Sequence, residues 1–211
     1  MFNRENKLHV LIGPEGGGKS MVGKRVASLQ NLTYVSTGDI LRNYRDNDKT
    51  VGGMGDICRE MFAKGDYLKP QMILDVLEKW FKENKINKNG MILDGGLRTL
   101  EETEGFQGML DKTGKRFFVD VICIRVPGWK AYERSYDRQR FNDTPKEILR
   151  RLGSYYDNLG LRMVTIRNNN WPVHIIDANE TKDEVFQNVL GVVGTKNKLS
   201  CGLFSYLRSF R

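Results

Sequence analysis

A glycine-rich segment near the start of the chain places the strongest constraint on what it can fold into. Residues 13–20 read Gly-Pro-Glu-Gly-Gly-Gly-Lys-Ser and match the spacing G-x-x-x-x-G-K-[ST] in full. The apolar run Leu8–Ile12 precedes this segment and reads as a buried strand, and the helical pattern Lys19–Leu29 follows it. Glycines in this context let the backbone wrap around a phosphate, while a helix N-terminus directs N–H groups at its oxygens. The segment therefore predicts a nucleotide-binding P-loop rather than a flexible glycine turn.

The P-loop motif assigns chemistry to its own residues. Lys19 is expected to reach the β- and γ-phosphates of a nucleoside triphosphate, and the Ser20 hydroxyl to reach Mg²⁺. The residues of this segment predicted to bind ATP are Gly13, Gly16, Gly17, Gly18, Lys19, Ser20 and Met21.

Short apolar runs alternate with longer helical patterns along the rest of the chain. The strand candidates are Leu8–Ile12, Tyr34-Val35, Met91–Leu93, Phe118–Val126 and His174–Ile176. The helix candidates are Lys19–Leu29, Asp39–Asp46, Gly55–Lys64, Pro70–Glu83, Trp129–Arg140, Lys146–Leu159 and Lys182–Val193. This alternation predicts an α/β protein with a P-loop NTPase-type three-layer fold around a central parallel five-stranded sheet. Ligands of such sheets bind outside the carboxyl ends of the strands.

Charge and cysteine content narrow the possible functions. The 211 residues include 34 Lys+Arg against 26 Asp+Glu, a formal net charge of +8. The arginines crowd between Arg134 and Arg151, which favours an electropositive cleft for phosphates over a nucleic-acid surface. Cys58, Cys123 and Cys201 lie far apart and fit neither a disulfide framework nor a zinc site. No run is long enough to span a bilayer, and we expect a cytoplasmic protein that does not bind nucleic acid.

Four further motifs follow in order. Residues 36–42 (STGDILR) come after the second predicted strand, and residues 93–98 (LDGGLR) close the third. Residues 65–70 read GDYLKP, and residues 134–143 read RSYDRQRFND, with Arg151 beyond them. With these motifs the chain resembles the nucleoside monophosphate kinases, most closely adenylate kinase of the short-lid type, from about Leu8 to Val193.

The resemblance implies a division of the chain. Residues 1–193 would form the kinase domain, with a helical acceptor-binding insertion at about 39–81 and a lid at about 134–143 that is too short for a zinc-bearing lobe. Residues 194–211 form a basic and apolar C-terminal extension. We expect this extension to pack on its own domain or to fray, and a membrane-surface or partner-binding helix is the alternative. The protein is expected to be a monomer.

The resemblance also implies roles for individual residues. The monophosphate would be held by Thr37, Arg42, Leu68, Arg98 and Glu102. The catalytic set around the transferring phosphoryl group would be Lys19, Arg98, Arg138, Arg140 and Arg151. Arg134 would lie against the base of ATP, Asp94 would join Ser20 in holding Mg²⁺ through water, and Asp143 would position the lid arginines. Arginine suits this chemistry because it stays charged and binds phosphate oxygens in a fork. Asp39 reads as the cap of a helix.

Three positions depart from the family pattern. Gly96-Leu97 replaces an aromatic–proline pair expected to stiffen the loop of Arg98, and Asn142 replaces the first aspartate of the lid pair. Glu102 stands where adenylate kinases place a glutamine that reads adenine. A carboxylate only accepts hydrogen bonds, so it would suit guanine or cytosine, although Thr37 favours the adenylate type. The alternative is that Glu102 turns to solvent.

The predicted reaction is reversible transfer of the γ-phosphoryl group from Mg²⁺·ATP to a nucleoside monophosphate, with AMP as the first choice. Two alternatives remain open at this point. One is a monophosphate kinase that prefers GMP or CMP/UMP, and the other is a catalytically weakened, kinase-like nucleotide-binding protein.

Overall fold

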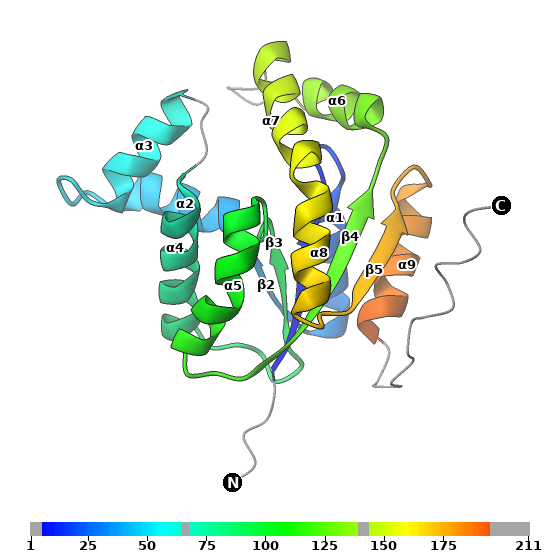
Figure 1. The fold of residues 1–211 in the computed structure, drawn as a ribbon, viewed down its shortest axis with the longest axis horizontal. Helices are drawn as coiled ribbons and strands as arrows, with labels where there is room; N and C mark the ends of the chain where they lie inside the picture. Colours follow the sequence, from blue (N-terminus) through cyan, green and yellow to red (C-terminus); the bar gives the residue numbers. More distant parts are fainter. Residues whose placement is uncertain (1–5, 65–67, 139–143, 195–211) are drawn as a thin grey trace, which may run out of the picture.

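A computed structural model of the chain describes residues 6–64, 68–138 and 144–194. Within these ranges one parallel sheet runs through the molecule in the strand order β2-β3-β1-β4-β5 (Figure 1). Its strands are β1 (Asn6–Ile12), β2 (Thr33–Ser36), β3 (Met91–Asp94), β4 (Phe117–Arg125) and β5 (Val173–Asp177). The parallel five-stranded sheet predicted from the alternating pattern is confirmed, with each strand within two residues of its expected bounds.

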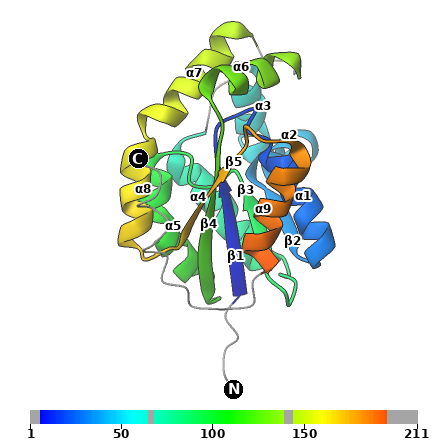
Figure 2. The same cartoon turned by 90° about the vertical axis from the view of Figure 1, so that its right-hand side faces the viewer.

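Helices cover both faces of the sheet and give three layers, which Figure 2 shows edge-on. One face carries α4 (Pro70–Glu83), α5 (Leu100–Lys112) and α8 (Leu159–Asn168), and the other carries α1 (Lys19–Gln30) and α9 (Lys182–Gly194). Successive strand residues point to opposite faces. Val10 therefore packs in the core under α4, α5 and α8, whereas Leu11 packs in the core under α1 and α9.

The remaining described helices lie toward the carboxyl edge of the sheet. The helices α2 (Thr37–Asn47) and α3 (Met54–Lys64) lead into α4, and all three lie between β2 and β3 in the chain. In Figure 1 they form a lobe on one side, while α6 (Gly128–Asp137) and α7 (Pro145–Asp157) lie above the strand ends. This arrangement leaves the carboxyl edge flanked by two sets of helices, where the ligand of a parallel sheet is expected.

The start of α2 corrects one expectation. Ser36 is the N-cap, and its hydroxyl accepts a hydrogen bond from the Asp39 backbone N–H at 3.4 Å. Asp39 lies in the first turn instead, where its negative charge favours the positive end of the helix dipole. The prediction that Asp39 caps the helix was wrong by three positions.

Two helices, α5 and α8, were absent from the sequence interpretation. Thr99 caps α5 by accepting a hydrogen bond from the Glu102 N–H at 3.1 Å, and Thr-x-x-Glu is a known helix-start signal. Gly105 in the middle of α5 argues against a helix by propensity. Packing explains why position 105 is a glycine, because a Cβ there would lie 2.5 Å from Leu74 Cδ1 on α4.

Among the residues that the structure describes, no helix is both long and apolar enough to cross a membrane.

Candidate active site

The P-loop joins the end of β1 to the start of α1. Gly16 has φ 76°, and a Cβ there would lie 2.2 Å from the carbonyl oxygen of Ala131 on α6, so a side chain cannot fit. Gly18 is the N-cap of α1 at φ 84° and has no side chain to satisfy the first-turn N–H groups. Those groups are therefore available to an anion at the helix N-terminus.

Lys19 points back into this loop. Its Nζ donates to the carbonyl oxygens of Gly13 at 2.8 Å and Pro14 at 2.7 Å. Burial is the main cause that lowers the pKa of Lys19 to about 8; the negative charge of Asp94 opposes this shift, and the positive charge of Arg98 adds to it. The ammonium group thus lies in a poorly hydrated site, where a phosphate anion would stabilise its charge.

Asp94 lies at the carboxyl end of β3 and is 3% exposed. Its Oδ2 accepts hydrogen bonds from Ser20 Oγ at 2.5 Å and from the Tyr34 hydroxyl at 2.8 Å. Burial and the charge of Asp94 raise the pKa of Tyr34, so the phenol stays protonated and donates. Ser20 and Asp94 offer hard oxygen atoms side by side, which suits Mg²⁺. Tyr34 was not predicted, and a tyrosine within an apolar strand gives no signal of such a contact.

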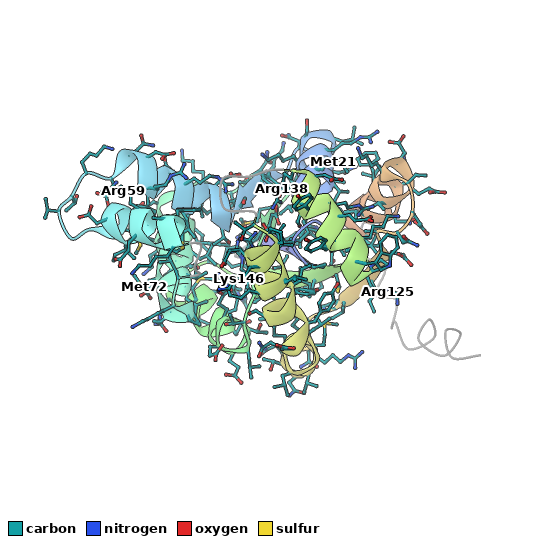
Figure 3. The ribbon with its side chains drawn as sticks, turned by 90° about the horizontal axis from the view of Figure 1, so that it is seen from above. Met21, Arg59, Met72, Arg125, Arg138 and Lys146 are labelled. Atoms are coloured by element: carbon teal, nitrogen blue, oxygen red, sulfur yellow. The ribbon has the colours of Figure 1, made fainter. Side chains whose placement is uncertain are left out.

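A carboxylate of the P-loop accepts hydrogen bonds from two of the predicted catalytic arginines. Glu15 Oε1 accepts from Arg138 Nη2 at 2.6 Å, and Glu15 Oε2 accepts from Arg151 Nε at 2.5 Å. Arg138 is the C-cap of α6, and Arg151, 7% exposed, lies on α7. Figure 3, seen from above, places Arg138 near the middle of the molecule, between Arg59 on one side and Met21 on the other. The sequence predicted that both arginines surround the transferring phosphoryl group, but it gave no role to Glu15.

A cavity of about 190 Å³ adjoins the P-loop on the side of α9. Arg134 lines it and donates from Nη2 to the carbonyl oxygen of Ala178 at 3.1 Å. The other residues lining this cavity are Gly16, Gly17, Gly18, Met21, Ala178, Glu180, Lys182 and Val185. The sequence did not predict Glu180 and Lys182 at this cavity. Glu180 lies between β5 and α9, and Lys182 is the first residue of α9.

The predicted acceptor residues lie on the lobe side. Thr37 is fully buried, and its hydroxyl has no hydrogen-bond partner among the described residues. Arg42 forms an ion pair with Asp39 one turn earlier on α2 and is 38% exposed at its side chain. Leu68 is buried in the core cluster beneath α4. A buried hydroxyl without a partner is uncommon and calls for a specific explanation.

Arg98 follows a loop of two glycines and a leucine. Gly95 has φ 85°, and a Cβ there would lie 2.6 Å from Arg98 Nη2, so the guanidinium lies over the glycine. Glu102 is 3% exposed, and its Oε2 accepts from the Arg98 backbone N–H at 2.8 Å. The alternative that Glu102 turns to solvent was therefore wrong. Burial raises its pKa, against the lowering effect of Arg98 and Arg162.

Some predicted residues lie outside the described ranges. These are Arg140, Asn142 and Asp143 of the lid motif, residues 65–67, and the C-terminal extension beyond residue 194.

Fold and site together define a P-loop phosphotransferase of the α/β class, because the lysine of the P-loop lies with Arg98, Arg138 and Arg151, which come from three separate elements. The sequence comparisons name the family. The adenylate kinase family model matches residues 11–165. The adenylate kinase of Trichodesmium erythraeum (strain IMS101) is 33% identical over 153 residues, covering 70% of this chain and 77% of that protein. The adenylate kinase of Mycobacterium sp. (strain MCS) is 31% identical over 186 residues, covering 88% and 98%.

The chain belongs to the adenylate kinase family. It is accordingly an ATP-dependent nucleoside monophosphate kinase, as its motifs predict.

Proposed function

We propose that this chain transfers the γ-phosphoryl group of ATP to AMP and releases two molecules of ADP. The observation that carries the proposal is the Glu15 carboxylate, which bridges Arg138 and Arg151 close to Lys19. An acidic group with two oxygens is held there as a phosphoryl group would be. The names of the relatives, which are adenylate kinases, support AMP as the acceptor.

The positively charged side chains at the site have separate roles in phosphoryl transfer. Lys19 and the first-turn N–H groups of α1 bind the β- and γ-phosphates, while Arg138 and Arg151 neutralise the charge that spreads over the moving phosphoryl oxygens. Arg98 grips the acceptor phosphate from the other side, near Lys19. No side chain acts as a nucleophile, because the acceptor phosphate itself attacks. Arg140 completes the predicted set from the sequence motif alone.

Base and acceptor binding follow from the two sides of the P-loop. The cavity lined by Arg134 receives the base of ATP, with its guanidinium already fixed on the Ala178 carbonyl. Thr37, Arg42 and Leu68 receive the monophosphate, and the partnerless hydroxyl of Thr37 supports this assignment. Glu102 remains the predicted base reader through Oε1, since Oε2 already binds the Arg98 N–H.

Mg²⁺ is the cofactor that the site suits. Ser20 and Asp94 would hold it, the aspartate through water, because their oxygens lie within hydrogen-bond distance of each other. When bound, the ion offsets phosphate charge and orients the β- and γ-phosphates.

The proposal also covers the division of the chain into functional parts and its oligomeric state. The helices α2–α4 serve as the acceptor-binding insertion and residues near 134–143 as the lid, within a kinase domain of residues 1–193. Closure of both would exclude water from the transfer. We further propose a monomer that acts in the cytoplasm on small nucleotides.

The test is product formation from Mg²⁺·ATP with AMP, GMP, CMP, UMP and dAMP in parallel, with Lys19→Ala as the inactive control. We expect AMP to be phosphorylated with the highest kcat/KM and activity to vanish when EDTA removes Mg²⁺. Preference for GMP or CMP would instead make Glu102 a reader of those bases. Binding of ATP without turnover on any acceptor would support the weakened-kinase alternative.

A further inference from the structure

Two buried charged side chains hold both backbone polar groups of Arg98. Glu102 accepts from the Arg98 N–H at 2.8 Å, and Arg162 Nη1 on α8 donates to the Arg98 carbonyl oxygen at 3.0 Å. Both side chains are nearly inaccessible, at 3% and 1% exposed. The residue predicted to grip the acceptor phosphate is therefore fixed at its backbone from two different helices.

Arg162 is an unusual residue to find in this position. Its Nε lies buried with no hydrogen-bond partner among the described residues, and burial lowers its pKa. Besides the Arg98 carbonyl, its guanidinium contacts the Tyr155 carbonyl at 3.4 Å and lies over the Tyr155 ring at 4.9 Å. A buried charge is usually no better for stability than an apolar side chain of similar volume. Stability alone therefore does not explain why Arg162 is buried against Arg98.

The loop before Arg98 explains why such a hold is needed. Gly95 and Gly96 add conformational freedom, and no proline restricts the segment between Asp94 and Arg98. Leu97 is 1% exposed and has φ 54°, a backbone conformation that is unfavourable for a leucine. A loop with this composition does not fix the direction of its last residue by local preference, so fixation has to come from outside it.

The side chain that the loop presents needs a fixed direction. The Arg98 guanidinium lies over Gly95, and its charge acts on Lys19 in the P-loop. A displacement of about 1 Å in a group that binds the reacting phosphates can reduce the rate by about 100-fold.

We propose that Arg162 is a positioning residue for phosphoryl transfer, which acts with Glu102 by clamping the backbone of Arg98 and so aiming its guanidinium at the acceptor phosphate. This inference rests on the proposed role of Arg98. The charge of Glu102 also favours the charged form of Arg162, so the two sides of the clamp support each other across the loop.

The first experiment compares Arg162→Met with Arg167→Met, an exposed arginine on the same helix. We expect Arg162→Met to raise KM for AMP and lower kcat, each about tenfold, with KM for ATP within about twofold of the wild type. Arg167→Met should leave all three constants unchanged. If Arg162→Met raises both KM values equally, or changes neither, Arg162 serves only the fold and the proposal is wrong.

Arg162→Lys covers the case in which the methionine variant fails to fold, since lysine keeps the positive charge and still donates hydrogen bonds. It should show the same AMP-selective defect at a smaller size, because lysine lacks the planar guanidinium that lies over the Tyr155 ring while Nη1 donates to the Arg98 carbonyl oxygen. A lysine variant with wild-type KM for AMP and wild-type kcat would overturn the proposal.

A double-mutant cycle separates this inference from the proposed function. In an Arg98→Ala background, Arg162→Met should change kcat/KM for AMP by less than about twofold, because the group it positions is gone. If Arg98→Ala itself leaves AMP kinetics unchanged, the assigned role of Arg98 fails. If Arg98→Ala impairs the reaction but the two effects simply multiply, Arg98 keeps its role and the clamp is wrong.

Discussion

Glu15 of the P-loop binds Arg151 of α7, with Nε to Oε2 at 2.5 Å, across 136 residues of sequence. The same carboxylate binds Arg138 through its other oxygen. Both arginines are thereby held at the rim of the P-loop, where Glu15 would compete with a phosphate for them.

Glu15→Gln should therefore tighten ATP binding. Removing one negative charge beside the phosphates is worth about 1 kcal/mol in a partly hydrated site, which lowers Kd for ATP about fivefold. Glu60→Gln on exposed α3 changes the net charge equally and should leave Kd unchanged. Titration calorimetry measures both, and weaker ATP binding by Glu15→Gln would show that the carboxylate assists rather than competes.

The lowered pKa of Lys19 predicts a pH limit for nucleotide binding. Its pKa of about 8 means that the free enzyme loses this positive charge as the pH rises above 8. Kd for ATP should then be constant below pH 8 and rise by up to about tenfold per pH unit above it. Bound phosphate raises the pKa again, so ATP binding at pH 8.5 should take up protons. Calorimetry in two buffers of different ionisation enthalpy detects the uptake, and a Kd that stays flat to pH 9.5 contradicts the assignment.

Thr37→Val separates binding from stability. The Thr37 hydroxyl is buried without a partner among the described residues, so its removal should leave the free energy of unfolding unchanged or raise it by about 1 kcal/mol. KM for AMP should rise about tenfold, because the hydroxyl no longer meets the acceptor. Thr37→Ser keeps the hydroxyl and serves as the control. If the valine variant binds AMP as well as the wild type, the hydroxyl does not contact the acceptor.

A network away from the site sets a pH dependence of stability. Asp120 on β4 lies between His174 Nε2 at 2.8 Å and His9 Nδ1 at 3.4 Å. Burial opposes ionisation of Asp120, but the hydrogen bond from His174, together with the nearby His9 ring, lowers its pKa to about 2. The bond to Asp120 raises the pKa of His174 above its usual value. Stability from His174 is thus complete below pH 6.5 and lost as the pH rises through the raised pKa, while that from Asp120 is lost below pH 4.

Asp120→Asn should therefore lower the free energy of unfolding by about 1.5–3 kcal/mol at pH 6, the usual value of hydrogen bonds to a charged group. It should also flatten the decline in stability between pH 6.5 and 9. Urea unfolding at several pH values measures both effects. A variant whose stability follows the wild-type pH profile in parallel would exclude the pair as the cause.

The parts of the site that sequence predicted are those whose position follows from a local motif. The P-loop spacing places Lys19 and Ser20 at a strand–helix junction, and parallel strands bring Asp94 to the same edge. The helix α5 was missed although Thr99 and Glu102 form a helix-start signal, because Gly105 and Gly108 lower its helix propensity.

Other residues could not be found in this way because their role depends on contacts far along the chain. Glu15 occupies a variable position of the P-loop motif, and nothing local shows that it meets two arginines. Arg162 lies in a segment for which the sequence predicted no helix, and its burial depends on how α8 packs against α5 and the loop of Arg98. How α8 lies against that loop depends on the packing of the whole folded chain.

The most direct test of the central claim follows the labelled γ-phosphate of ATP when the wild-type protein is mixed with Mg²⁺ and AMP. The account predicts that the label appears in the β-phosphate of ADP, that two ADP form for each ATP consumed, and that Lys19→Ala abolishes both. Release of the label as inorganic phosphate, or a label that stays in ATP while the nucleotide is bound, would contradict phosphoryl transfer between nucleotides as the function of this site.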